Sequence, residues 1–193
     1  MKRKIVIMAM IVIATAFSSC GNGNRSGKTA ETKTAEAQTA VDTTELKKMN
    51  WEKMKPGYAV PDFTLMGLDG KEMSLSDFKG KYVLLDFWGT WCRWCVKGLP
   101  EMKEYYARYA DKIEFVGISC RESEEAWREG VGTHALPWTN LYNGYDQTLI
   151  VDYGIQGYPT KIILDADGKV VEAFLGEDPA LYEKLDEMFA QKS

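Results

Sequence analysis

The stretch that decides the fold is Trp91-Cys92-Arg93-Trp94-Cys95. It lies shortly after the apolar run of residues 82–87, whose length and composition predict a buried strand. Two residues separate the cysteines, so their thiols can close a small ring as a disulfide and reopen it. We expect a helix to begin at this pair, which places both cysteines at the junction of a strand and a helix.

The predicted helix start changes the chemistry of the first thiol. Backbone N–H groups without partners at a helix N-terminus carry a partial positive charge, which favours the thiolate of Cys92. Arg93 adds a full cation beside it. The pKa of a free cysteine is ~8.5, and such a setting lowers it to about 7 or below. We expect Cys92 to be the more exposed, attacking thiol and Cys95 to be the buried, resolving thiol.

A purely structural role for the two cysteines is the alternative. The chain has cysteines at positions 20, 92, 95 and 120 and a single histidine, His134. A structural zinc ion needs four ligands, and no second cysteine pair or histidine cluster is present, so we predict no metal site. Cys120 is either a third reactive thiol or, as free cysteines more often are, a small buried hydrophobe.

Asp86 lies inside the apolar strand, six residues before Cys92. A carboxylate there is costly unless it has a partner or a task. Burial should raise its pKa, which suits a base that takes the proton from Cys95. The alternative is a solvated residue at the edge of a sheet.

A second motif, Gly157-Tyr158-Pro159-Thr160, precedes the predicted strand of residues 161–164. A proline that opens a strand cannot donate a hydrogen bond to the ladder. We predict a cis Tyr158–Pro159 bond, which leaves the Tyr158 backbone available to pair with an extended substrate segment. The alternative is an ordinary proline at the start of a strand.

Taken together, these motifs resemble those of thioredoxin-fold disulfide oxidoreductases. The resemblance rests on the Cys-x-x-Cys pair after Asp86-Phe87-Trp88, on Pro100, and on residues 157–160. The run of residues 61–81 resembles the membrane-tethered TlpA/ResA branch, and the match covers residues 58–190. The chain departs from the pattern at two places. Arg93-Trp94 stands where thioredoxin has Gly-Pro, and Gly98 stands where many TlpA/ResA-like reductants carry an acidic residue.

The resemblance implies the fold class α/β, in the form of a thioredoxin-like three-layer α/β/α sandwich. A central mixed sheet is expected, with an extra N-terminal β-hairpin around the turn Asp69-Gly70. The remaining expected elements are helices at residues 93–110, 122–131 and 146–153, strands at 113–119, within 134–142 and at 170–175, and a final helix after Asp178-Pro179.

It also implies thiol–disulfide exchange through Cys92 and Cys95, most simply as a reductase of envelope proteins such as apocytochrome c or misoxidised proteins. No cofactor is needed, because electrons come from another dithiol protein, here a membrane reductant. The substrate surface would be formed by Trp91, Arg93, Trp94, Tyr158 and Pro159.

Three other functions stay open at this point. The first is an oxidase or isomerase on the same scaffold. The second is a peroxidase, although Leu85 and Gly89 stand where a Pro-x-x-x-Thr-x-x-Cys motif would have its proline and threonine. The third is a redox-silent binding module, in which Cys92→Ser would change nothing.

Residues 1–19 read as a targeting signal. The basic Lys2-Arg3-Lys4 precedes an apolar run at residues 5–17, which is shorter than the ~20 residues of a membrane-spanning helix. The segment ends in Ser18-Ser19-Cys20, which resembles a bacterial lipobox. The resemblance implies a lipidated Cys20 and a domain anchored in the cell envelope, facing the periplasm. An ordinary cleaved signal is the alternative.

Composition divides the remaining chain. Residues 20–50 have few bulky apolar residues and predict a disordered tether, so the folded domain would span residues 51–193. The formal charge of −4 and the absence of a basic stripe argue against nucleic-acid binding.

Overall fold

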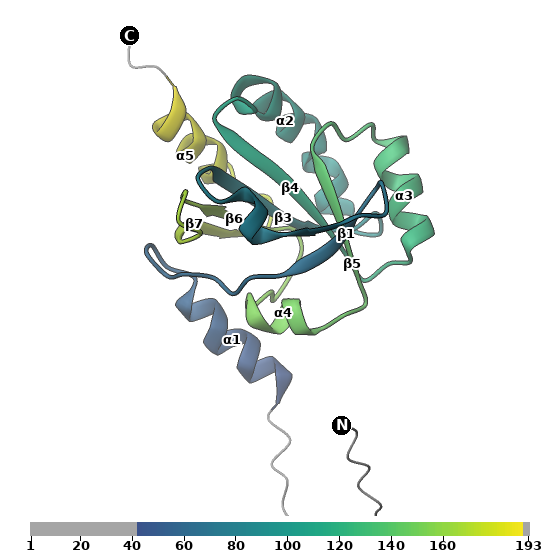
Figure 1. The fold of residues 1–193 in the computed structure, drawn as a ribbon, viewed down its shortest axis with the longest axis horizontal. Coiled ribbons are helices and arrows are strands. Elements are labelled where there is room, and N and C mark those ends of the chain that lie inside the picture. The colour runs from purple at the N-terminus through teal and green to yellow at the C-terminus, as the bar shows by residue number, and fades with distance from the viewer. Residues whose placement is uncertain (1–41, 191–193) are drawn as a thin grey trace, which may run out of the picture. The chain divides into compact units, whose positions relative to one another are not determined.

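The computed structural model describes residues 42–190. The proposed signal, Cys20 and most of the predicted tether therefore lie outside the described residues. The elements, labelled in Figure 1, are α1 (Thr43–Lys53), β1 (Thr64–Gly67), β2 (Glu72–Ser74), a 3-10 turn (Leu75–Phe78), β3 (Tyr82–Trp88), α2 (Arg93–Tyr109), β4 (Ile113–Cys120), α3 (Glu124–Thr133), β5 (Thr139–Gly144), α4 (Thr148–Asp152), β6 (Thr160–Leu164), β7 (Val170–Leu175) and α5 (Ala180–Phe189).

The strands form one seven-stranded mixed sheet in the order β2-β1-β5-β4-β3-β6-β7. Strand β3, which leads into the cysteine pair, lies inside this sheet, parallel to β4 and antiparallel to β6. The predicted hairpin of β1 and β2 is confirmed. It also extends the sheet, because β1 pairs with β5 through Met66 and Tyr142, which the sequence did not indicate.

Helices cover both faces of the sheet, as the three-layer prediction requires. Leu85 and Phe87 of β3 belong to a core packed with α4, whereas Leu84 and Trp88 belong to a second core packed with α2, α3 and α5. Figure 1 shows α2 and α5 on one side of the sheet and α1 and α4 on the other. Because side chains alternate along a strand, Asp86 points to the face that α2 covers.

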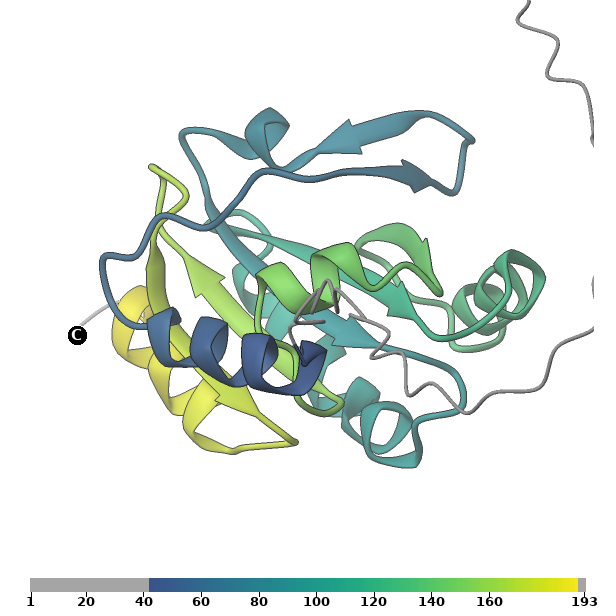
Figure 2. The same cartoon turned by 90° about the horizontal axis from the view of Figure 1, so that it is seen from below.

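The folded domain begins earlier than predicted. The sequence predicts a tether over residues 20–50 and a domain from residue 51. The structure instead begins α1 at Thr43, where the Asp42 side chain accepts a hydrogen bond from Thr44 N–H at 2.9 Å. Asn50 Nδ2 donates to the Val151 carbonyl of α4 at 2.8 Å, and both Figure 1 and Figure 2 show α1 next to α4. The helix has no buried residue. It therefore lacks the apolar stripe by which a packed helix is recognised.

Local capping groups set the ends of two other helices. The helix predicted at 122–131 runs two residues later, because the Ser123 hydroxyl accepts Ala126 N–H at 3.2 Å and fixes its start. The helix predicted at 146–153 is shorter, and the Asp146 carboxylate accepts Thr148 N–H at 2.8 Å just before it. The short strand expected within 134–142 is β5, which extends to Gly144.

Candidate active site

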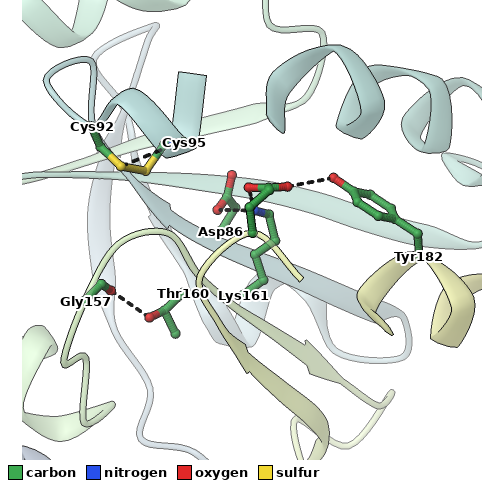
Figure 3. Close-up of polar contacts among 8 residues, drawn as sticks. Asp86, Cys92, Cys95, Gly157, Thr160, Lys161 and Tyr182 are labelled. Carbon is green, nitrogen blue, oxygen red and sulfur yellow. Dashed lines mark hydrogen bonds and ion pairs between the residues drawn. A yellow bond between two sulfur atoms is a disulfide. The ribbon is translucent and has the colours of Figure 1, made fainter. Parts of the chain in front are cut away.

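Cys92 and Cys95 are joined as a disulfide, with their Cα atoms 5.3 Å apart (Figure 3). Cys92 is the N-cap residue of α2, and its sulfur accepts the Cys95 N–H at 3.2 Å. The cysteine pair therefore stands between the end of β3 and the first turn of α2, as predicted. A sulfur in this position faces the positive end of the helix dipole, which favours a negative charge there once the disulfide is opened.

Cys92 is buried in the disulfide form and hardly more exposed than Cys95, although the sequence predicts a clear difference between the two. Its exposed fraction is 5% and that of Cys95 is 4%, since both sulfurs pack into the core beneath α2. The exposed groups around them are aromatic, with Trp91 at 46% and Trp94 at 60%. The surface around the buried disulfide is therefore formed in part by exposed indole, which is apolar.

Asp86 is fully enclosed on the α2 side of the sheet. Burial raises its pKa from the ordinary 3.8 to about 6, Lys161 opposes that rise, and Glu177 adds to it. Among the described residues Asp86 Oδ1 has no hydrogen-bond partner, and the Lys161 ammonium lies 3.8 Å from it. The structure thus shows the burial that the sequence predicts, and that burial is the main cause of the raised pKa.

Sequence reasoning missed the groups that surround Asp86. Lys161 pairs with Asp86 across the β3–β6 ladder and is only 3% exposed. Its ammonium donates to Glu177 Oε2 at 2.8 Å, and the Tyr182 hydroxyl donates to Glu177 Oε1 at 3.1 Å. The sequence did contain an indication of Lys161, because burying a lysine in an otherwise apolar strand costs as much free energy as burying an aspartate.

Gly98 has a defined packing role. A Cβ atom at this position would lie 2.3 Å from the Glu177 carboxylate. The glycine of α2 thus makes room for a carboxylate that comes from the loop between β7 and α5. Many TlpA/ResA-like reductants carry an acidic residue at the position of Gly98. Here an acidic group lies beside that position, but it comes from Glu177 in another segment of the chain.

The loop of residues 157–160 has the predicted form. The Tyr158–Pro159 bond is cis, and the Thr160 hydroxyl donates to the Gly157 carbonyl at 2.8 Å. Within residues 42–190 the Tyr158 N–H and C=O have no backbone hydrogen-bond partner. The Tyr158 ring lies edge-on to Trp91 with centroids 5.3 Å apart. A backbone able to pair with an extended chain therefore lies next to the exposed indoles.

The end of β4 and the residue that follows it also contact Trp91. The indole Nε1 donates to the Cys120 carbonyl at 2.8 Å, and the Arg121 guanidinium lies 4.8 Å from the ring centroid. Arg121 has a φ of 61°, in the left-handed region. None of these contacts could be found from the sequence, because each joins segments about thirty residues apart.

Glu122 is a further buried group at the site, with an exposed fraction of 4%. Its carboxylate accepts the Thr90 N–H at 3.0 Å, the Thr90 hydroxyl, and the Ser119 hydroxyl at 2.6 Å. The backbone that leads into the cysteine pair is thereby tied to the end of β4.

The remaining predicted residues have clear positions. Cys120 is free and fully buried, and burial raises the pKa of its thiol far above the ordinary value, so it is a core residue. Arg93 is exposed at the start of α2. Trp94 and Tyr158 line one groove together with Gly98 and Glu177.

Two features are absent from the part of the chain that the structure describes. Within residues 42–190 no three or more His, Cys, Asp or Glu side chains are grouped so that they could hold a metal ion. None of the helices in that same part of the chain has both the length and the apolar content needed to cross a membrane.

The chain is similar in sequence to known proteins. Residues 56–173 match the model of the AhpC/TSA family. The thiol-disulfide oxidoreductase ResA of Bacillus anthracis is 39% identical over 127 residues, which are 65% of this chain and 73% of that protein. The thioredoxin-like protein YneN of Bacillus subtilis is 36% identical over 126 residues, which are 64% and 73% of the two chains.

Two solved structures extend the comparison. The thioredoxin domain of a thiol-disulfide oxidoreductase from Bacteroides vulgatus has a TM-score of 0.63 and 33% identity, covering 69% of this chain and 96% of that one. A putative thiol:disulfide interchange protein DsbE from Chlorobium tepidum has a TM-score of 0.62 and 32% identity, covering 68% and 93%.

Proposed function

Because the chain belongs to the AhpC/TSA family and is a thiol-disulfide oxidoreductase of the ResA/DsbE type, we propose that it works as a reductase of proteins in the bacterial cell envelope. The observation that carries the proposal is the placement of the Cys92–Cys95 pair. It lies at a helix N-terminus, with exposed indoles in front and the buried carboxyl of Asp86 behind. The proposed direction of electron flow is supported by the resemblance to TlpA/ResA-like reductants.

The reaction begins from the reduced pair. The Cys92 thiolate attacks one sulfur of a client disulfide, which forms a mixed disulfide and releases the other client sulfur as a thiolate. Cys95 gives its proton to Asp86 and attacks the Cys92 sulfur, which closes the Cys92–Cys95 disulfide and releases the second client thiolate. The client gains two electrons and the protein loses two. A dithiol protein of the membrane then returns the protein to its reduced form.

Clients would bind as extended segments. The Tyr158 N–H and C=O can pair with a client backbone as an added strand does, and Trp91 and Trp94 offer apolar contact on either side. Arg93 and Pro159 complete this proposed surface. Suitable clients are proteins that present a disulfide in an unfolded chain, such as apocytochrome c or misoxidised envelope proteins.

The proposed location depends on the N-terminal segment. A lipidated Cys20 would hold the domain at the membrane and facing the periplasm, as the resemblance of Ser18-Ser19-Cys20 to a lipobox suggests. Labelling cells with a radioactive or alkyne-bearing fatty acid would detect the lipid, and Cys20→Ser should abolish the label.

The peroxidase alternative is disfavoured at Gly89. A Cβ atom there would lie 2.4 Å from Trp91 Nε1 and 2.9 Å from the Cys120 carbonyl oxygen, so the threonine of the peroxidatic motif has no room. An oxidase remains the second candidate. Its potential would lie near that of DsbA, ~−120 mV, whereas a reductase would lie near thioredoxin, about −270 mV. Equilibration with glutathione separates the two.

Trapping in cells tests the exchange itself. The variant Cys95→Ser cannot resolve the mixed disulfide, so client proteins should remain attached to Cys92 and be recovered under non-reducing conditions. The matched control is Cys92→Ser, which lacks the attacking sulfur and should trap none. Equal recovery from both variants, or none from either, would contradict the proposal.

A further inference from the structure

We propose that Glu177 is a positioning residue for disulfide exchange: it holds the Lys161 ammonium away from Asp86 and so keeps Asp86 basic enough to accept the proton of Cys95. This inference rests on the proposed function and deepens it. It assigns a task to a carboxylate and an ammonium that lie outside the cysteine and proline motifs.

A single buried cation is shared unequally between two carboxylates. Lys161 Nζ lies 2.8 Å from Glu177 Oε2 and 3.8 Å from Asp86 Oδ1. The first distance is that of a charge-assisted hydrogen bond, and the second is beyond hydrogen-bond range. Lys161 therefore bonds to Glu177 and acts on Asp86 through its charge alone. Asp86 Oδ1 is left without a hydrogen-bond partner among residues 42–190.

Glu177 is held in this position by the elements around it. The Tyr182 hydroxyl of α5 donates to its other carboxylate oxygen at 3.1 Å. Gly98 of α2 leaves the space that its carboxylate fills, since a Cβ atom there would lie 2.3 Å away. Gly176 precedes Glu177 in the chain, and its φ of +87° is readily adopted only by glycine. Three segments thus converge to place one carboxylate next to one lysine.

Glu177 is also the member of the group that reaches solvent. Its side chain is 19% exposed, against 3% for Lys161 and 5% for Asp86. It opens into the groove that it lines with Trp94 and Tyr158. Water in that groove can stabilise the ionised carboxylate, so that Glu177 remains a partner for the buried ammonium.

The charges around Asp86 set the direction of each effect. Lys161 favours the ionised form of Asp86, which lowers its pKa, while Glu177 opposes ionisation and raises it. The Tyr182 hydroxyl of α5 donates to Glu177, and its pKa is raised by burial and then by the charges of Glu177, Glu101 of α2 and Asp86. Burial also raises the pKa of the Cys120 thiol, and the charge of Asp86 adds to that rise. Without Glu177, the ammonium would lose its nearest partner and turn to Asp86, which would become a weaker base.

The proton step depends on this balance. In the mixed disulfide the Cys95 thiol must give its proton to the Asp86 carboxylate before its sulfur can attack Cys92. The attack closes the Cys92–Cys95 bond and expels the client thiolate, which takes a proton from solvent. An Asp86 held tightly by Lys161 accepts the proton less readily, so resolution becomes slower at neutral pH.

The test compares three variants. Glu177→Gln keeps the size of the side chain and an acceptor for Lys161 but removes the charge. Lys161→Met removes the cation. Glu101→Gln is the matched control, because it removes a carboxylate that lines the same groove and has no ion pair with Lys161. The pKa of Asp86 is read from the carboxyl ¹³C resonance of the oxidised protein over pH 4–9, which requires no exchange activity.

We expect opposite shifts. Glu177→Gln should lower the proton affinity of Asp86 and Lys161→Met should raise it, each by at least about threefold, while Glu101→Gln leaves it unchanged. Reaction of the reduced proteins with dithiobis(nitrobenzoate) gives the second readout, since release of the second thionitrobenzoate reports attack by Cys95. Its pH midpoint should move with the titration of Asp86 in each variant.

Shifts in the same direction, or an unmoved midpoint in Glu177→Gln, would overturn the proposal even if Lys161→Met fails to fold. A change in the pKa of Asp86 with no change in the pH dependence of thionitrobenzoate release would overturn the proposal as well. Failure of the proposed function looks different: the wild-type protein would then leave client disulfides intact whatever the variants do to Asp86.

Discussion

Replacing Asp86 with Asn should stabilise the oxidised protein at pH 8 by about 3 kcal/mol while impairing its exchange reaction. The pKa of Asp86 is about 6 in the fold against an ordinary 3.8, with burial as the main cause. One pKa unit corresponds to ~1.36 kcal/mol, so ionising this buried carboxyl costs the folded state about 3 kcal/mol. Asparagine has nearly the same shape and no charge to bury.

The sign of the pH dependence follows from the raised pKa. Well below pH 3.8 the carboxyl is protonated in both the folded and the unfolded chain and costs nothing. As the pH rises toward and through 6, the unfolded chain ionises first, and stability is lost until the folded state ionises too. The gain from Asp86→Asn should therefore grow from under about 1 kcal/mol at pH 4 to about 3 kcal/mol at pH 8.

Urea unfolding of the oxidised wild-type and variant proteins at both pH values measures this difference. Asp111→Asn, at an exposed position, is the control and should change stability little at either pH. In the reduced protein, loss of the base should slow resolution by Cys95 by roughly 10²–10⁴-fold. A variant that is less stable than the wild type at pH 8, or whose gain is the same at both pH values, would refute the reasoning.

Three further predictions concern the surroundings of the site. Cys120 should resist alkylation in the native protein and react only in urea, because its thiol is buried with a raised pKa; rapid native labelling would contradict this. Glu122→Ala leaves the buried donors of Thr90 without an acceptor, so the midpoint of urea unfolding should fall by an amount equivalent to ~1–3 kcal/mol, and an unchanged midpoint would speak against the contact. Gly154→Ala should lower the free energy of unfolding by ~1–3 kcal/mol, since the φ of Gly154 is +62° and a Cβ atom would lie 2.2 Å from Trp51 N. Faster proteolysis within α1 would show that the helix has detached from the domain, and unchanged proteolysis would count against its docking.

The parts of the fold that follow a local rule could be predicted from the sequence. The apolar run of β3 and the helix start at Cys92 indicated the junction that carries the site, and Asp86 stood out as a charge within that run. The hairpin turn at Gly70 was indicated by its dipeptide, and the glycine has a φ of +78°. In each case the physical cause lies within a few residues of the pattern.

What could not be predicted depends on contacts between distant segments. Glu177 forms an ion pair with Lys161 only because β6 and β7 lie side by side. The need for glycine at position 98 is visible only in the structure, because the Glu177 carboxylate occupies the space that a Cβ atom would fill. The burial of Cys92 is a property of the packed core, since a position at a helix start says nothing of what covers it. Helix α1 docks without a buried side chain and so leaves no apolar period in the sequence.

Transfer of electrons from the cysteine pair to a protein disulfide is the claim on which the interpretation depends. The most direct measurement mixes the reduced protein with oxidised insulin under anaerobic conditions and counts both kinds of disulfide by mass spectrometry after acid quenching. We expect one Cys92–Cys95 disulfide to form for each insulin disulfide that is lost, and no transfer from Cys92→Ser. Insulin that keeps its disulfides, or loses them equally with Cys92→Ser, would contradict the claim.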